Sequence, residues 1–185
     1  MVSMDTSRRD ATNGKLRKIR ALVAAALLGG GVGLIVLLIV TTGRNQDQMP
    51  RVTPEDFAGA KQRWRSAGQH SYDLTVVVTG RQAATYQVAV RGGQVQRATR
   101  DGLPLRQRRT QGTWSVPGMF TTIQSDVDNL EKHLHGTADR STPQVLLRGV
   151  FHAELGYPLR YHRTELRKWG NNLEAAWEVV SFELW

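Results

Sequence analysis

The longest hydrophobic stretch of the chain is an uninterrupted run at residues 21–40, which contains no charged side chain. At about 1.5 Å per residue, a helix of this length spans the roughly 30 Å hydrocarbon core of a bilayer. Leu, Ile and Val, which favour insertion, fill most of the run. The pattern predicts a transmembrane helix over residues 21–40.

The residues before this run predict its orientation. Residues 1–20 contain six Lys or Arg side chains against Asp5 and Asp10. The positive-inside rule places this basic tail in the cytoplasm, so that everything after residue 40 is exported. The rival interpretation is a cleaved signal peptide, whose apolar region is usually shorter and ends at small residues such as Thr41 and Gly43. The length of the run favours retention as an anchor.

Small residues recur at every fourth position along the beginning of the run, namely Ala21, Ala25, Gly29 and Gly33. Such a stripe lets two transmembrane helices approach closely, which predicts self-association through this face. The alternative is that Ala and Gly are simply common in membrane anchors. Gly30 and Gly31 beside the stripe make its spacing less distinctive.

Polar residues 41–53 predict a short linker between the anchor and an exported domain. Thr53 followed by Pro54 is typical of a helix start, and Phe57 and Trp64 fall on one face of the helix that follows. Apolar residues that step by three and four positions predict a second helix, at Phe120, Ile123, Val127, Leu130 and Leu134.

Elsewhere, apolar and polar residues alternate with the period of two that is typical of half-buried strands. The expected strands cover residues 72–78, 86–90, 94–100, 103–110, 145–152, 159–165 and 173–185. Gly92 and Gly93 supply the positive backbone angles of a tight hairpin, and short turns make neighbouring strands antiparallel. The order predicts an α+β fold: one domain over residues 54–185, in which two helices cover one face of an antiparallel sheet.

Charge and composition disfavour several classes of function. The formal net charge is +9, but much of it lies in residues 1–20, and residues 54–185 are only mildly basic. Because the domain is predicted to be exported and lacks aromatic residues interleaved with its basic ones, we do not expect nucleic acid as a partner. The absence of cysteine excludes disulfides, thiolate metal sites and a cysteine nucleophile.

No group of residues predicts a catalytic, cofactor or metal site. His133 and His135 lie two positions apart on a helix, where their side chains point away from each other and cannot share one ion unless the helix ends between them. His152 and His162, on neighbouring strands, lack a third ligand. The last strand carries three acidic residues, Glu174, Glu178 and Glu183. A polar sheet face accounts for them better than a catalytic pair does.

The most specific candidate for binding is a group of five arginines: Arg97, Arg100, Arg106, Arg108 and Arg109. If strands 94–100 and 103–110 pair across the turn at Asp101 and Gly102, several of these guanidinium groups share one neighbourhood. They would then bind an anionic partner, either anionic lipid or an acidic membrane protein. The alternative is a solvated strand face whose charges pair with acidic residues of the same domain.

Several short segments together carry a family resemblance: Trp64, Tyr72, Val88-Ala89-Val90-Arg91-Gly92-Gly93-Gln94-Val95, Asp101-Gly102, Met119-Phe120-Thr121-Thr122-Ile123 and Leu155-Gly156-Tyr157-Pro158. In these the chain resembles an uncharacterised bacterial family of small exported domains, many of them lipoproteins, with a Gly-Tyr-Pro turn motif. The resemblance covers most of residues 63–182. It implies an envelope location, here the bacterial inner membrane, and no known enzymatic activity. The family usually has acidic residues at about the places of His152 and the Asn171-Asn172 pair, so their role does not carry over.

Together these observations predict a membrane-anchored extracytoplasmic domain that acts as an envelope interaction or scaffolding module. The alternative is an envelope enzyme, of a hydrolytic kind, whose site is not visible in the sequence. A concave pocket that contains several titratable groups would favour the enzyme, and a flat exposed face would favour the module.

Overall fold

The first helix of the domain begins at a capping box. The computed structural model describes residues 48–185, and within them helix α2 spans Pro54–Ala67. The Thr53 hydroxyl accepts a hydrogen bond from the Asp56 amide at 3.1 Å, and the Asp56 carboxylate accepts one from the Thr53 amide at 3.4 Å. Gly68, with a φ of 61°, closes the helix in the left-handed conformation that glycine adopts without strain.

Seven strands form one antiparallel sheet in the order β4-β3-β2-β1-β7-β6-β5. The elements after α2 are β1 (Tyr72–Thr79), β2 (Ala84–Arg91), β3 (Gln94–Arg100), β4 (Leu103–Pro104), α3 (Arg108–Gln111), α4 (Val116–Leu134), β5 (Gln144–Phe151), β6 (Pro158–Leu166) and β7 (Leu173–Leu184). Because β1 pairs with β7, the central pair joins the meander β1–β4 to the later meander β5–β7.

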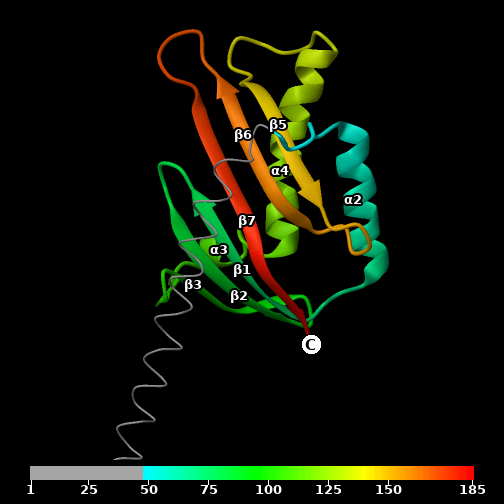
Figure 1. The fold of residues 1–185 in the computed structure, drawn as a ribbon, viewed down its shortest axis with the longest axis vertical. Coiled ribbons are helices and arrows are strands. Elements are labelled where there is room, and N and C mark those ends of the chain that lie inside the picture. Colours follow the sequence, from blue (N-terminus) through cyan, green and yellow to red (C-terminus); the bar gives the residue numbers. More distant parts are fainter. Residues whose placement is uncertain (1–47) are drawn as a thin grey trace, which may run out of the picture. The chain divides into compact units, whose positions relative to one another are not determined.

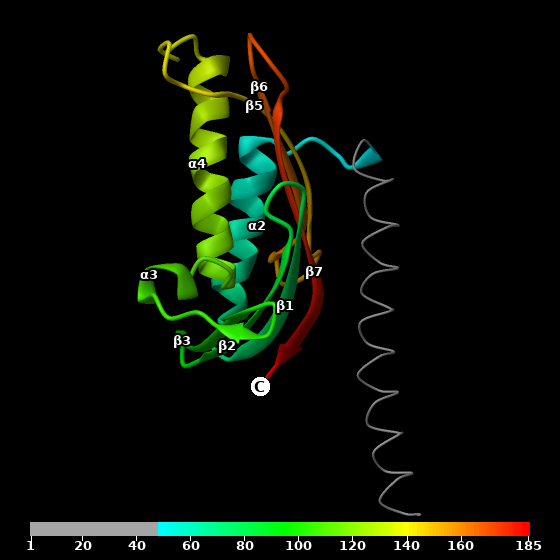
Figure 2. The ribbon, with the colours of Figure 1, turned by 90° about the vertical axis from the view of Figure 1, so that its left-hand side faces the viewer.

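Helices α2 and α4 cover one face of this sheet, as Figures 1 and 2 show. Alternate residues of β1 are buried between the helices and the sheet, among them Tyr72, Leu74 and Val76. Phe57 of α2 meets Phe120 of α4 edge to face, with ring centroids 5.9 Å apart. The structure therefore confirms the predicted α+β fold, an antiparallel sheet with two helices.

The strand predicted over residues 103–110 is wrong beyond its first two residues. Strand β4 covers Leu103–Pro104 only, and residues Arg108–Gln111 form the short helix α3. Pro104 has no amide hydrogen for a longer ladder, and the side chain of Gln111 donates to the carbonyl of Leu105 at 2.7 Å. The chain therefore turns away from the sheet instead of extending its edge.

The end of the predicted linker belongs to the domain. Arg51 forms an isolated antiparallel bridge with Arg148 of the edge strand β5. The Val52 amide donates to the Leu147 carbonyl at 3.0 Å, and the Arg148 guanidinium donates to the Met49 carbonyl at 2.7 Å. This segment satisfies part of an edge that would otherwise be open to other strands.

Three predictions concern residues before Gln48 and lie outside the described residues. They are the basic tail at residues 1–20, the transmembrane helix at residues 21–40, and self-association through Ala21, Ala25, Gly29 and Gly33. Among the helices of residues 48–185, none combines the length and the hydrophobicity that a membrane crossing requires.

Candidate functional site

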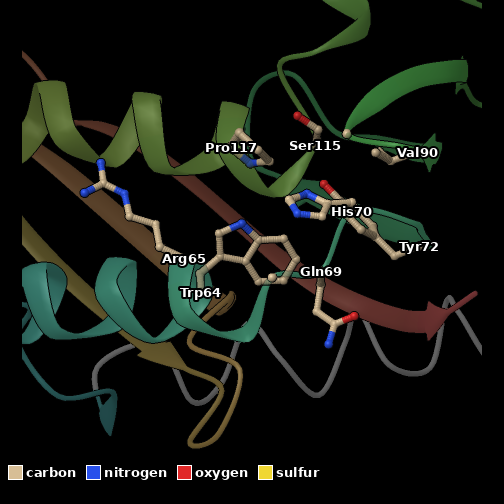
Figure 3. Close-up of a pocket in the computed structure, with 10 residues that line it drawn as sticks. Trp64, Arg65, Gln69, His70, Tyr72, Val90, Ser115 and Pro117 are labelled. Carbon is tan, nitrogen blue, oxygen red and sulfur yellow. The ribbon is translucent and has the colours of Figure 1, made fainter.

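A pocket of about 330 Å³ opens where the end of α2 meets the start of α4 (Figure 3). Its lining comes from α2, β1, β2, the β2–β3 turn and the start of α4: Trp64, Arg65, Gly68, Gln69, His70, Tyr72, Val90, Gly93, Ser115 and Pro117. The size lies at the lower end of the range for ligand pockets, about 300–1,000 Å³. It is large enough for a small molecule or for one large side chain of a partner.

The aromatic wall of this pocket is held by a stack of rings. Tyr72 stacks on Phe182 with centroids 5.3 Å apart, Phe182 stacks on Tyr157 at 4.2 Å, and Tyr157 stacks on His152 at 4.8 Å. Trp64 stands edge-on against this stack, 5.5 Å from Tyr72. Rings that pack at these distances and angles hold one another in place. The apolar side of the pocket is therefore preformed.

Polar side chains form the rim. His70 and Arg65 are exposed, and Figure 3 shows the imidazole of His70 lying between the Trp64 ring and the start of α4. Within residues 48–185, neither the Arg65 guanidinium nor the His70 imidazole takes part in a hydrogen bond or an ion pair. Both groups remain available to a ligand, and the arginine would favour an anionic one.

The start of α4 offers less to a ligand than its position suggests. The Val116 amide donates to the Tyr72 hydroxyl at 3.1 Å, and the Gly118 amide donates to the Ser115 hydroxyl at 3.3 Å. Ser115 also donates to the Gly112 carbonyl at 2.7 Å, so both hydrogen-bonding roles of its hydroxyl serve the helix cap. The geometry therefore supports neither an anion cradle at the helix start nor a serine nucleophile.

Tyr72 links the pocket to the stability of the domain at high pH. Its side chain is 1% exposed, and burial raises its pKa from 10.0 to about 12. An unfolded chain loses this proton near pH 10 while the folded chain keeps it, so the stabilisation is complete below pH 10 and is lost as the pH rises through about 12.

We therefore expect the free energy of unfolding to fall by about 2 kcal/mol more in the wild type than in Tyr72→Phe between pH 9 and pH 12. Urea titrations at fixed pH values measure this difference. Parallel pH profiles for the two proteins would contradict it. Tyr86→Phe, in the same sheet, controls for a general effect of removing a hydroxyl group.

A second polar feature lies in the core between α4 and β6. The Asp126 carboxylate accepts a hydrogen bond from the Tyr161 hydroxyl at 2.8 Å and an ion-paired one from Arg163 Nε at 2.7 Å. Arg163 also donates to Glu165 at 2.8 Å, and this bond lowers the pKa of the Glu165 carboxyl. Tyr161, Arg163 and Glu165 all lie on β6 and Asp126 lies on α4, so the network fixes α4 on the sheet. Sequence reasoning missed it.

The five candidate arginines do not share one strand pair. Arg97 and Arg100 both lie on β3, three positions apart and so on opposite faces of the sheet, and Arg106 is exposed in the loop after β4. Arg108 and Arg109 belong to α3, of whose first two side chains nothing is described. The Arg100 guanidinium lies 5.9 Å from the Tyr86 ring centroid. Binding of an anionic partner by this group stays a prediction.

The histidines considered as metal ligands in the sequence analysis contact backbone groups or are buried in the structure. His133 contacts the carbonyls of Thr142 and Pro143 at 3.2 Å, and the His152 ring accepts the Leu155 amide at 3.1 Å. His162 is buried, its Nε2 lies 3.9 Å from the Glu174 carboxylate, and it forms no hydrogen bond. Within the described part of the chain, no three His, Asp or Glu residues are grouped to hold a metal ion.

Comparisons with known proteins add no information about this pocket. No family model, curated protein or solved structure matches the chain. The pocket at the end of α2 and the start of α4 combines a preformed apolar wall with polar groups that have no partner among residues 48–185.

Proposed function

We propose that the chain is a single-pass inner-membrane protein whose extracytoplasmic domain is an interaction module for a partner in the envelope. The anchor is the run at residues 21–40, with the N-terminus in the cytoplasm. The pocket between α2 and α4 supports the interaction, because it combines a rigid aromatic wall with a polar rim. A pocket of this kind receives one anchoring side chain of a partner protein.

The chemistry of the pocket defines the partner side chain. Trp64, Val90 and Pro117 suit an aromatic or branched aliphatic group, and the exposed Arg65 suits a carboxylate next to it. The same residues argue for binding rather than hydrolysis, since Ser115 is occupied by the cap and His70 has no nucleophile in hydrogen-bonding contact.

The test is site-specific photo-crosslinking of the full-length chain in its own membranes, after an alkaline carbonate wash. We expect the chain to stay in the membrane fraction, and a photoreactive residue at position 70 to crosslink one partner. The same residue at position 87, on the exposed face of β2, should not. Arg65→Glu should weaken the crosslink about tenfold, because it reverses the charge at the rim.

Arg63→Glu is the matched control, since Arg63 is exposed on the same helix and does not line this pocket. Equal crosslinking at positions 70 and 87, or equal loss in both charge reversals, would contradict the pocket as the binding site. Release of the chain by carbonate would contradict the anchor.

A further inference from the structure

One end of the domain, which we name the tip, carries exposed apolar side chains. The tip consists of the last turn of α4, the loop at residues 135–143, and the end of β6 with the β6–β7 turn, residues 165–172. Figures 1 and 2 place these segments together at the top of the domain. Trp169 is 90% exposed, Leu134 66% and Leu166 41%. His133 ties α4 to the start of β5, where Gln144 pairs with Leu166. These groups therefore share one end.

Two exposed basic groups of the tip take part in no ion pair, while one of its acidic groups, Glu165, is ion-paired. Asp139 accepts hydrogen bonds from Ser141 and Thr142, which lower its pKa to about 2. Glu165 is paired with both Arg163 and Arg167. Lys168 and Arg140 are exposed and take part in no ion pair within residues 48–185. The charge next to Trp169 in the sequence, that of Lys168, is therefore positive and has no ion-pair partner among the described residues.

Exposed apolar residues also occur at the opposite end of the domain, so the two ends must be compared. There, Leu103, Leu184 and Trp185 are exposed. The Trp185 ring is already covered by the Arg91 guanidinium, 4.6 Å from its centroid, and Asp73 holds that arginine at 2.7 Å. Trp169 has no such ring contact within the described residues. Its apolar surface has no partner from its own domain.

The point at which the chain enters the domain also favours the tip. Arg51 pairs with Arg148 of β5, which pairs with His162 of β6 and through it with Ala176 of β7, so these residues form one row across the sheet. From Ala176 the strand continues about 10 Å to its tip end at Leu173 and about 27 Å to Leu184. Arg51 therefore lies in a row much nearer the tip, and the residues before it run antiparallel to β5, with the Pro50 carbonyl accepting a hydrogen bond from the Gly149 amide.

From these observations we infer that the tip rests on the lipid bilayer, with Trp169, Leu166 and Leu134 at the interface and Lys168 and Arg140 among anionic headgroups. The inference rests on the proposed anchor, since residues 41–47 reach at most about 25 Å and so hold the domain close to the surface. Tryptophan is enriched at membrane interfaces. Basic residues close to such an interface are attracted to anionic lipid.

Quenching of tryptophan fluorescence by brominated lipid tests this contact. The full-length chain is reconstituted into phosphatidylcholine vesicles, with and without phosphatidylglycerol, whose acyl chains carry bromine. All five tryptophans lie at or after Trp64, so the signal reports on the domain alone. We expect Trp169→Phe to remove more than half of the quenching and Trp185→Phe to leave it unchanged. Replacing Arg140 and Lys168 by Gln should reduce it only where phosphatidylglycerol is present.

Other outcomes overturn the inference. They are an absence of quenching in the wild type, quenching that survives Trp169→Phe, and quenching lost when Arg106, Arg108 and Arg109 are replaced by Gln, which would put the opposite end on the membrane. Protection of Trp169 from aqueous acrylamide in native membranes but not in vesicles would assign the tip to a protein instead. A carbonate wash of the same vesicles separates the premises: release of the chain contradicts the anchor, whereas retention without Trp169 quenching contradicts only the tip contact.

Discussion

Replacing Gly156 by alanine is expected to lower the free energy of unfolding by about 2–5 kcal/mol. Gly156 has a φ of 78°, which costs an alanine about 1–2 kcal/mol. The added methyl group would also collide with the Ala60 carbonyl of α2, and it would lie 2.8 Å from Arg63 Cβ and 2.9 Å from the Trp64 amide nitrogen. These atoms belong to a helix backbone that cannot yield locally, so overpacking adds about 1–3 kcal/mol.

Gly102→Ala is the matched control for this variant. Gly102 has a φ of 81°, almost the same as Gly156, but no atom lies within 4 Å of the position that a methyl group would take. It should therefore cost only the backbone term, about 1–2 kcal/mol. Urea denaturation of both variants measures the difference. Equal losses would mean that α2 can move away from the turn, contrary to the packing described above.

The close contact between Gly156 and α2 also affects the pocket. The turn at Gly156 places Tyr157 in the ring stack, and Trp64 of α2 stands edge-on against that ring with centroids 6.5 Å apart. If Gly156→Ala forces α2 away, the aromatic wall of the pocket moves with it. The loss of crosslinking at position 70 should then accompany the loss of stability.

Local patterns were sufficient to predict most elements of the fold. The capping box at Thr53, the glycines of the β2–β3 turn and the alternation along β1 each act within a few residues, so the sequence displays them directly. The pairing of β1 with β7 brings Tyr72 opposite Leu184. No local signal specifies a contact between residues so far apart, and the strand order was accordingly not predicted.

The prediction of a strand over residues 103–110 is wrong for a local reason, which the alternation of apolar and polar residues does not reveal. Leu103 and Leu105 alternate with polar or turn residues, as a strand would, but Pro104 cannot donate to a ladder. The argument that the five arginines share one neighbourhood assumed that strand, so it loses this support, and binding of an anionic partner by the group stays a prediction. Arg97 and Arg100, on opposite faces of one strand, show why spacing along the chain is a poor guide to a charged patch.

The pocket and the buried network both depend on tertiary packing. The pocket joins the end of α2 to the start of α4, about fifty residues later, and no motif marks either. A weak signal for the network did exist. Asp126 lies on the apolar side of α4, beside the buried Ile123 and Val127, where an acid is unexpected unless it is paired. Its partner, Arg163, occupies a core-facing position of β6.

Replacing Asp126 by alanine should destabilise the domain by about 3 kcal/mol, because it leaves the half-buried guanidinium of Arg163 with Glu165 as its single carboxylate partner. It also removes the acceptor of the Tyr161 hydroxyl, which is buried and whose pKa is raised by burial and by this carboxylate. Tyr161→Phe removes only that hydroxyl and should cost about 1 kcal/mol. Urea denaturation of both variants measures the two losses.

A double-mutant cycle separates the ion pair from the packing around it. Asp126→Leu with Arg163→Met replaces both charges by apolar side chains, and it should be less destabilising than Asp126→Ala, because no buried charge remains unpaired. If the double variant is as unstable as the sum of its single variants, the pair does not couple α4 to β6. The helix would then be held on the sheet by its apolar face alone, through residues such as Ile123 and Val127.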